Sequence, residues 1–429
     1  MNKTLIQIVF IFFLIVHTHI PAVCQTTYSL YDLAKLANIH SETIKIAQED
    51  VYIAQQDKAR ALSVLIPRAT AYGSINEYKN ENIAAPDTIA LGVKLTQSFT
   101  LNGKELIALD VTKRTIEGKE FSLESIRSQY LLQVAQVYFN ILSAQRFSEI
   151  AQSDVKRLKI HRDSVKEHLS VGNVTKTDLY RAEAELSKSL TEQVIAENRI
   201  LQTKAALQNL VEIEDNFNLP KEDIKGIENY ECTLEDIQTY ALENRPEIKE
   251  AKKNLEIARK TIKFKKSDYW PVLALEAGYK ETDLKYDPIN YDTEDAYLKG
   301  ELVFTLYDGG LRKAEIRQAF ADQRKTENIL LLQKKRIILD SKTAFLTYRT
   351  AKSALQNLQH ELKSANENYT AVQMQFKYGM ANTIDMMDAN TLLVTAQRRI
   401  SDAKYTYYIA VLGILYTKGE LTALLLNQA

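Results

Sequence analysis

Two aspartates, Asp385 and Asp388, stand three residues apart shortly after a glycine, Gly379. Residues with this spacing lie on one face of a helix, so both carboxylates are expected to point to the same side. If several copies of the chain met around one axis, the acids would form a ring that favours cations, repels anions and retains some protons through mutual repulsion. A simpler interpretation is that acids are favoured in the first turn of any helix. The residues alone leave both interpretations open.

Sulfur and imidazole side chains near the same turn raise the question of a metal. The methionines that gather there are Met374, Met380, Met386 and Met387. Thioethers bind Cu(I) and Ag(I), but methionines far more often fill irregular packing at adaptable interfaces. His161 and His168 share a helix face, and no third ligand is near them in the sequence. We therefore predict no metal site and no cofactor.

The composition and the motifs argue against two other classes of function. Lys and Arg number 55, as do Asp and Glu, so the net charge is +0. A chain without excess positive charge is poorly suited to bind nucleic acid through its phosphates. The sequence has no phosphate-binding glycine loop, metalloprotease signature or nucleophile elbow. We predict that the protein is not an enzyme and does not bind nucleic acid.

The N-terminus has the pattern of an export signal. Lys3 precedes a short apolar run over residues 5–16, and the small residues Ala22 and Cys24 follow. This pattern predicts a cleavable signal peptide over residues 1–24, cut after Cys24. A lipid anchor at Cys24 is a weaker interpretation, because the residues before it suit that processing poorly. A retained membrane anchor is the other alternative, although the run is short for a spanning helix.

The rest of the chain is an internal duplication. Residues of the first half recur in the second half in the same order. The matching pairs are Leu30/Leu234, Asp32/Asp236, Ala37/Ala241, Pro67/Pro271, Gly172/Gly379, Asp178/Asp385 and Ala182/Ala389. We therefore predict two equivalent repeats, 25–212 and 232–429, joined by a linker over 213–231.

Each repeat changes its hydrophobic period twice. A capped helix runs up to the proline, and apolar and polar residues then alternate, which predicts β-hairpins over 69–101 and 272–307. Strands of about ten residues suit a tilted crossing of a membrane. Long helices without proline follow, to turns near Gly172 and Gly379, and each could extend roughly 100 Å. A return helix completes each long helical hairpin.

Four strands per chain cannot close a membrane barrel, and open sheet edges are not tolerated in lipid. Three copies would supply twelve strands, enough to surround a pore. The predicted fold is mainly α-helical with a small β-barrel portion. It combines an internally duplicated, long α-helical barrel with four strands per chain, which close a twelve-stranded membrane β-barrel as a trimer.

With its duplicated helix starts, its prolines between helix and strand and its glycine turns, the sequence resembles the TolC family of outer-membrane efflux proteins. The resemblance extends over nearly the whole mature chain. It implies a homotrimer in the outer-membrane lipid, with its helical tunnel in the periplasm. It also implies a periplasmic adaptor (membrane fusion) protein, expected to contact the turns at Gly172 and Gly379, and an inner-membrane efflux transporter.

The resemblance also implies roles for individual residues. It assigns Asp385 and Asp388 to a pore constriction and Asp178 to the network that holds the entrance shut. In the family pattern an arginine two residues after the glycine and a tyrosine three before it complete that network. Ala381 and Phe376 occupy these positions here. A gate network that includes Asp178 and Phe376 must therefore close by other contacts.

Together with these observations, the resemblance implies an exit duct that passively conducts the substrates of a tripartite efflux pump. One alternative is an exit duct for type I protein secretion. Another is a structural coiled-coil protein that spans the periplasm without conducting. Long charged helices fit all three functions, but alternating strands in both repeats favour a channel.

Overall fold

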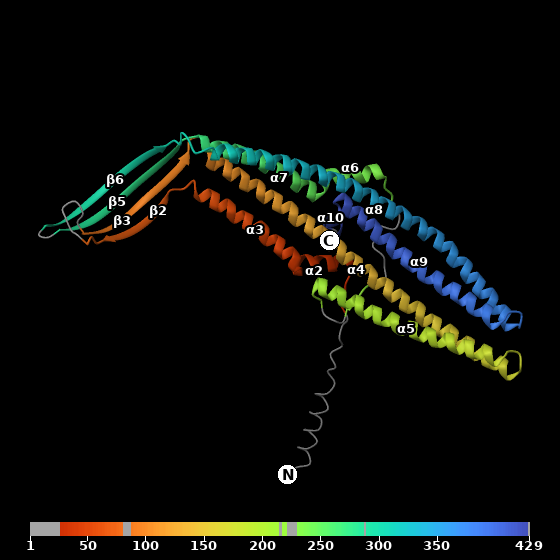
Figure 1. The fold of residues 1–429 in the computed structure, drawn as a ribbon. Coiled ribbons are helices and arrows are strands. Elements are labelled where there is room, and N and C mark those ends of the chain that lie inside the picture. Colours follow the sequence, from red (N-terminus) through yellow and green to blue (C-terminus); the bar gives the residue numbers. More distant parts are fainter. Residues whose placement is uncertain (1–25, 80–86, 214–216, 221–229, 287–288, 428–429) are drawn as a thin grey trace, which may run out of the picture.

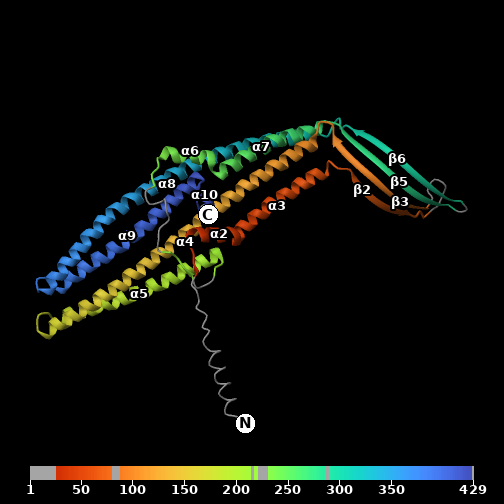
Figure 2. The ribbon, with the colours of Figure 1, turned by 180° about the vertical axis from the view of Figure 1, so that it is seen from behind.

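The computed structural model describes residues 26–79, 87–213, 217–220, 230–286 and 289–427. The molecule is elongated, with a sheet at one end and the turns of two long helical hairpins at the other (Figures 1 and 2). The predicted signal peptide over 1–24 lies outside the described residues, as does most of the predicted linker over 213–231.

Short helices open each half of the chain. They are α2 (Leu30–His40) and α3 (Glu42–Ser63) in the first half, and α6 (Leu234–Asn244) and α7 (Pro246–Lys266) in the second. Where the sequence predicted one helix, each half therefore has two. Ser41 ends α2 and caps α3 by accepting a hydrogen bond from the Ile44 N–H at 3.3 Å. Pro246 has no N–H to continue α6, so it becomes the first residue of α7.

Four strands form one antiparallel sheet in the order β2-β3-β5-β6. The strands are β2 (Arg68–Asn76), β3 (Asp87–Thr100), β5 (Val272–Tyr286) and β6 (Ile289–Val303). The central pair joins the two halves of the chain, with Thr100 opposite Val272 and Asp87 opposite Lys285. The outer strands β2 and β6 each pair on one side in the described part of the chain.

The second hairpin is shorter than the sequence predicted. The alternation suggested pairing to residue 307, but β6 ends at Val303. Its partner β5 begins at Val272, directly opposite Val303, so the ladder has no partner beyond this point. The Asp308 carboxylate then accepts hydrogen bonds from the N–H groups of Gly310 and Arg312, both at 3.0 Å, and turns the chain into the next helix.

Two long helices, α4 (Lys104–Ser170) and α8 (Leu311–Lys377), leave the sheet and contain 67 residues each. At 1.5 Å per residue each helix extends about 100 Å. Two return helices, α5 (Lys176–Val211) and α9 (Thr383–Lys418), pack against α4 and α8 respectively. The short strands β1 (Thr26–Thr27) and β4 (Phe217–Asn218) pair in parallel. No helix in the described ranges has an apolar stretch long enough to cross a membrane.

The largest apolar core lies midway along the molecule, where α2, α6 and α10 (Leu421–Asn427) pack onto the long hairpins (Figure 1). Its largest fully buried side chains include Tyr138, Phe139, Phe217, Leu30, Leu33 and Leu131. Burying one such side chain contributes about 1.5–3 kcal/mol. A smaller apolar cluster lies near the turns of the hairpins and includes Phe376 and Met386. The largest apolar core is therefore separate from both the sheet and the hairpin turns.

Candidate pore and entrance

The sheet has one apolar face and one polar face. On β3, Leu91, Val93 and Leu95 are 62%, 55% and 50% exposed. The residues between them, Gly92 and Lys94, are less exposed. The strand register extends the apolar face across the sheet, because Leu95 lies opposite Ala277, which lies opposite Leu298. A sheet in water shows the opposite pattern, so the apolar face requires a non-aqueous neighbour.

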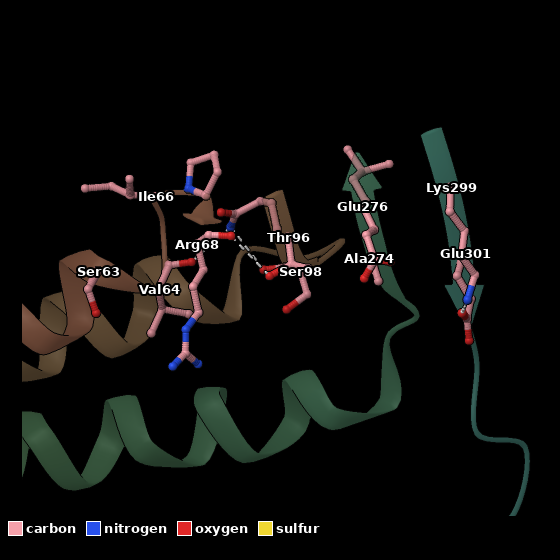
Figure 3. Close-up of a pocket in the computed structure, with 13 residues that line it drawn as sticks. Ser63, Val64, Ile66, Arg68, Thr96, Ser98, Ala274, Glu276, Lys299 and Glu301 are labelled. Carbon is pink, nitrogen blue, oxygen red and sulfur yellow. Dashed lines mark hydrogen bonds and ion pairs between the residues drawn. The ribbon is translucent and has the colours of Figure 1, made fainter. Parts of the chain in front are cut away.

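The polar face remains charged down to the end of the sheet nearest the helices. A cavity of about 790 Å³ lies there, lined by the segment between α3 and β2 and by all four strands (Figure 3). The Gln97 side chain donates to the Val64 carbonyl at 2.9 Å and ties that segment to β3. Lys299 and Glu301 on β6 form an ion pair at 2.9 Å. A water-filled passage requires a polar wall of this kind.

At the opposite end of the molecule, the two helical hairpins turn side by side (Figures 1 and 2). Gly172 and Gly379 have φ angles of 79° and 73°, a left-handed conformation that favours glycine. The N–H of the residue after each glycine bonds back to the preceding helix: Asn173 to the His168 carbonyl at 2.9 Å, and Met380 to the Gln375 carbonyl at 2.8 Å. Both predicted turns therefore have the same C-terminal cap.

Asp178 and Asp385 each cap the start of a return helix. The Asp178 carboxylate accepts from the backbone N–H of Thr175 at 2.9 Å, and the Asp385 carboxylate accepts from the backbone N–H of Asn382 at 2.9 Å. In return, the side chains of Thr175 and Asn382 accept from the N–H groups of the two aspartates. Hydrogen bonds from the Thr175 hydroxyl and N–H lower the pKa of Asp178. Helix capping is enough to explain why an acidic residue occupies positions 178 and 385.

Asp388 has no such role. It is exposed on α9, one turn after Asp385, and its side chain has no hydrogen bond or ion pair in the portion of the chain that is described. Asp178, Phe376, Gly379 and Asp385 all line one cavity of about 770 Å³ between the two turns. Gly172 and Asp388 do not line it. The structure thus brings four of the six sequence-predicted residues together.

Phe376 is a packing residue. Its side chain is 7% exposed, and its ring lies edge-on to His161, with ring centroids 4.9 Å apart. His161 is 6% exposed, and its Nε2 atom has no hydrogen-bond partner among the described residues. Burial lowers the pKa of His161 to about 4, so the ring is neutral at pH 7. Phe376 therefore contributes aromatic packing between α4 and α8.

A buried polar network nearby was missed by the sequence reasoning. The Asn390 amide of α9 donates to the Asp154 carboxylate of α4 at 2.8 Å and accepts from Arg157 Nε at 3.0 Å. The Arg157 guanidinium lies 5.9 Å from the centre of the Tyr369 ring. Because residues far apart in the sequence form the network, no local motif indicates it.

The methionines near the turns differ in burial. Met386 is buried in the apolar cluster near the turns, whereas Met374 and Met380 are exposed. Among the described residues, no group of three His, Cys, Asp or Glu side chains is arranged to hold a metal ion. The burial of Met386 favours packing as its role.

Comparison with known proteins identifies the family. A family model described as outer membrane efflux protein matches residues 33–211 and 239–416, one stretch in each half of the chain. The chain belongs to the outer membrane efflux protein family. The predicted family resemblance is therefore confirmed, as is a mainly helical fold with a small β-barrel portion. The protein is located in the outer membrane with its helical tunnel in the periplasm.

Individual relatives in the efflux protein family cover most of the chain. Outer membrane protein TolC of Escherichia coli is 23% identical over 94% of this chain and 85% of its own length. Proteases secretion protein PrtF of Dickeya chrysanthemi is 22% identical over 65% of this chain and 63% of its own. The CmeC outer membrane channel of Campylobacter jejuni has the same fold, with a TM-score of 0.80, 16% identity and coverage of 91% and 86%.

These relatives narrow the class of function. They are efflux or secretion proteins of the outer membrane, and their family is one of channels rather than enzymes. CusC, a structural neighbour, is described in the context of transmembrane channel formation.

Proposed function

We propose that the protein is a passive exit duct of a tripartite efflux pump. The observation that carries this proposal is the sheet, whose exposed apolar face and polar opposite face suit a wall between lipid and water. The same strands lead directly into helices of 67 residues, so a passage through the sheet would continue along the helices.

The proposed duct is a homotrimer. Strands β2 and β6 each have one open edge in the described chain, and open edges are not stable in lipid. If β6 of one copy pairs with β2 of the next, three copies close a ring of twelve strands. The helices of the three copies would then surround a tunnel on the same axis.

The proposed entrance lies at the hairpin turns. Asp385 and Asp388 form the constriction, with Asp388 the more available acid because the Asp385 carboxylate also caps its helix. Asp178 and Phe376 contribute to the closed gate through a capped turn and aromatic packing. A periplasmic adaptor contacts the turns at Gly172 and Gly379, and an inner-membrane transporter supplies the energy. The proposed duct has no enzymatic activity of its own.

Conductance in planar bilayers tests the proposal. Purified protein should raise discrete current steps, and replacing both Asp385 and Asp388 with Ala should enlarge them and reduce the preference for cations. Glu49→Gln, at an exposed acid on α3 far from the turns, is the matched control and should behave as wild type. Wild-type protein and the double variant that both fail to raise current would exclude conduction and favour a structural coiled-coil role.

Type I protein secretion is a second candidate function, because PrtF is named as a secretion protein. The two functions separate in a host that lacks its own outer-membrane duct. Expression of this chain should restore resistance to small toxic compounds if it serves efflux. Restored release of a secreted protease, without restored resistance, would favour the secretion function.

A further inference from the structure

Two tyrosines of the sheet lie directly over glycines on the neighbouring strand. Tyr72 on β2 is opposite Gly92 on β3, and Tyr297 on β6 is opposite Gly278 on β5. A Cβ atom added at Gly92 would lie 2.9 Å from Cζ and the hydroxyl oxygen of Tyr72. One added at Gly278 would lie 2.6 Å from Cζ of Tyr297. Both distances are too short for any side chain, so each ring occupies the space that a glycine leaves open.

The same arrangement of a tyrosine over a glycine occurs once in each half of the chain. In both, the tyrosine is on an outer strand and the glycine is on an inner strand. An aromatic ring that covers a cross-strand glycine replaces the packing that the glycine lacks. Each ring therefore lies along the sheet and does not stand out from it.

A charged pair links the two tyrosines across the sheet. The Tyr297 hydroxyl donates to Glu276 Oε1 at 2.9 Å, and Glu276 Oε2 lies 3.5 Å from Lys94 Nζ. The same Lys94 ammonium lies 5.8 Å from the centre of the Tyr72 ring. Tyr72, Lys94, Glu276 and Tyr297 thus form one cluster across all four strands.

The cluster belongs to the polar face of the sheet. Lys94 alternates with the exposed Val93 and Leu95 and lies opposite Gly278, whose other neighbour is Tyr297. Side chains of one cross-strand row point to the same face. If the polar face lines the water-filled passage, as the proposed function requires, both tyrosines line that passage.

On the basis of that proposed function, we infer that Tyr72 and Tyr297 set the free bore of the strand-built part of the pore, and that Gly92 and Gly278 keep it wide. The glycines let both rings lie flat against the wall. Any side chain at these glycines would force the rings into the passage. In a trimer six rings would move inward, so the size of the largest solute that passes would fall.

Gly278 gives the cleaner test of this inference, because a Cβ at Gly92 would also meet the Tyr279 carbonyl oxygen at 2.9 Å. Gly278→Ala should reduce single-channel conductance roughly twofold in planar bilayers. Gly300→Ala is the matched control on the same sheet. A Cβ there would meet Leu275 at an ordinary 3.6 Å, so wild-type conductance is expected.

A compensating variant keeps the test decisive. Gly278→Ala combined with Tyr297→Thr removes the ring that causes the collision, and conductance should return to the wild-type value or exceed it. If Gly278→Ala fails to assemble, recovery of an open channel in the double variant still supports the inference. Gly278→Ala that conducts like wild type, or a double variant no better than the single one, would overturn it. Wild-type protein that carries no current would instead refute the proposed function.

Discussion

The two hairpin turns share a capped helix start but differ three residues later. Asp178 and Asp385 occupy equivalent positions, and each accepts a hydrogen bond from the N-cap backbone at 2.9 Å. Three residues beyond them, the first half has Arg181 and the second half has Asp388, both exposed. The shared acid is therefore explained by the start of a helix, whereas Asp388 is not. The position that differs is the stronger candidate for a role in ion selection.

The turns also differ in what packs behind them. His161 of α4 and Phe376 of α8 meet across the two hairpins, and Asn390 of α9 reaches into the polar pair Asp154 and Arg157 of α4. The second hairpin therefore contributes the Phe376 ring and the Asn390 amide, and both contact side chains of the first hairpin. We expect the stability of the entrance to depend on these contacts and its ion selectivity to depend on Asp388.

The largest loss of stability should occur at low pH, because the buried His161 is neutral in the folded protein. In an unfolded chain histidine titrates near pH 6.5, whereas burial lowers its pKa to about 4 in the fold. Between these values the unfolded chain binds a proton that the folded chain does not bind. Stability is therefore complete above about pH 6.5 and falls by about 3 kcal/mol as the pH drops to 4.

Thermal unfolding of the wild type and of His161→Phe at pH 7.5 and pH 5 measures this effect. The variant should lose less stability between the two pH values, because a phenyl ring has no proton to bind. His360→Gln, at an exposed histidine on α8, is the control and should keep the wild-type pH dependence. Equal pH dependence in wild type and His161→Phe would contradict the buried, neutral state of His161.

A smaller loss should follow from Asn390→Ala. The change removes the donor to Asp154 and the acceptor for Arg157, and leaves both groups partly buried without these bonds. One lost buried hydrogen bond costs about 1–3 kcal/mol. Chemical denaturation of Asn390→Ala should show a loss of this size. Asn366→Ala, at an exposed site on α8, should change stability by less than about 0.5 kcal/mol. Equal stability of the two variants would mean that the network adds nothing to the entrance.

Replacing either capping acid, Asp178 or Asp385, should cost less stability than replacing Asn390. Asp178→Ala and Asp385→Ala each remove the hydrogen bond to the N-cap backbone, which should cost about 1 kcal/mol. Asp388→Ala removes no hydrogen bond in the described chain and should leave stability within about 0.5 kcal/mol of wild type. Denaturation midpoints of the three variants measure the comparison directly. A large loss in Asp388→Ala alone would reverse the assignment of the structural and the selective acid.

Local signals in the sequence predicted much of this arrangement. The glycine turns, the proline-free helices and the alternating strands each depend on a few adjacent residues, and α4 ends at Ser170, just before the predicted turn at Gly172. The end of β6 at Val303 was misjudged because it depends on where β5 begins. The break at Ser41 was missed because one serine within a helical pattern does not by itself indicate a cap.

The candidate site was predictable only in part, for a related reason. Asp385 and Asp388 are conspicuous in the sequence, but helix capping and ion selection favour the same residue type. The hydrogen bonds of Asn382 and Thr175 were needed to distinguish the capping role from a role in ion selection. The network around Asn390 and the glycines beneath Tyr72 and Tyr297 depend on contacts between distant segments. Such contacts leave no pattern in neighbouring residues.

The reversal potential in planar bilayers under a salt gradient most directly tests the assignment of Asp388 to the pore. Wild-type protein should prefer cations. Asp388→Asn should move the reversal potential toward zero, whereas Asp178→Asn, which alters the shared capping acid, should leave it at the wild-type value. An Asp388→Asn channel with the wild-type reversal potential would contradict the placement of this acid in the pore.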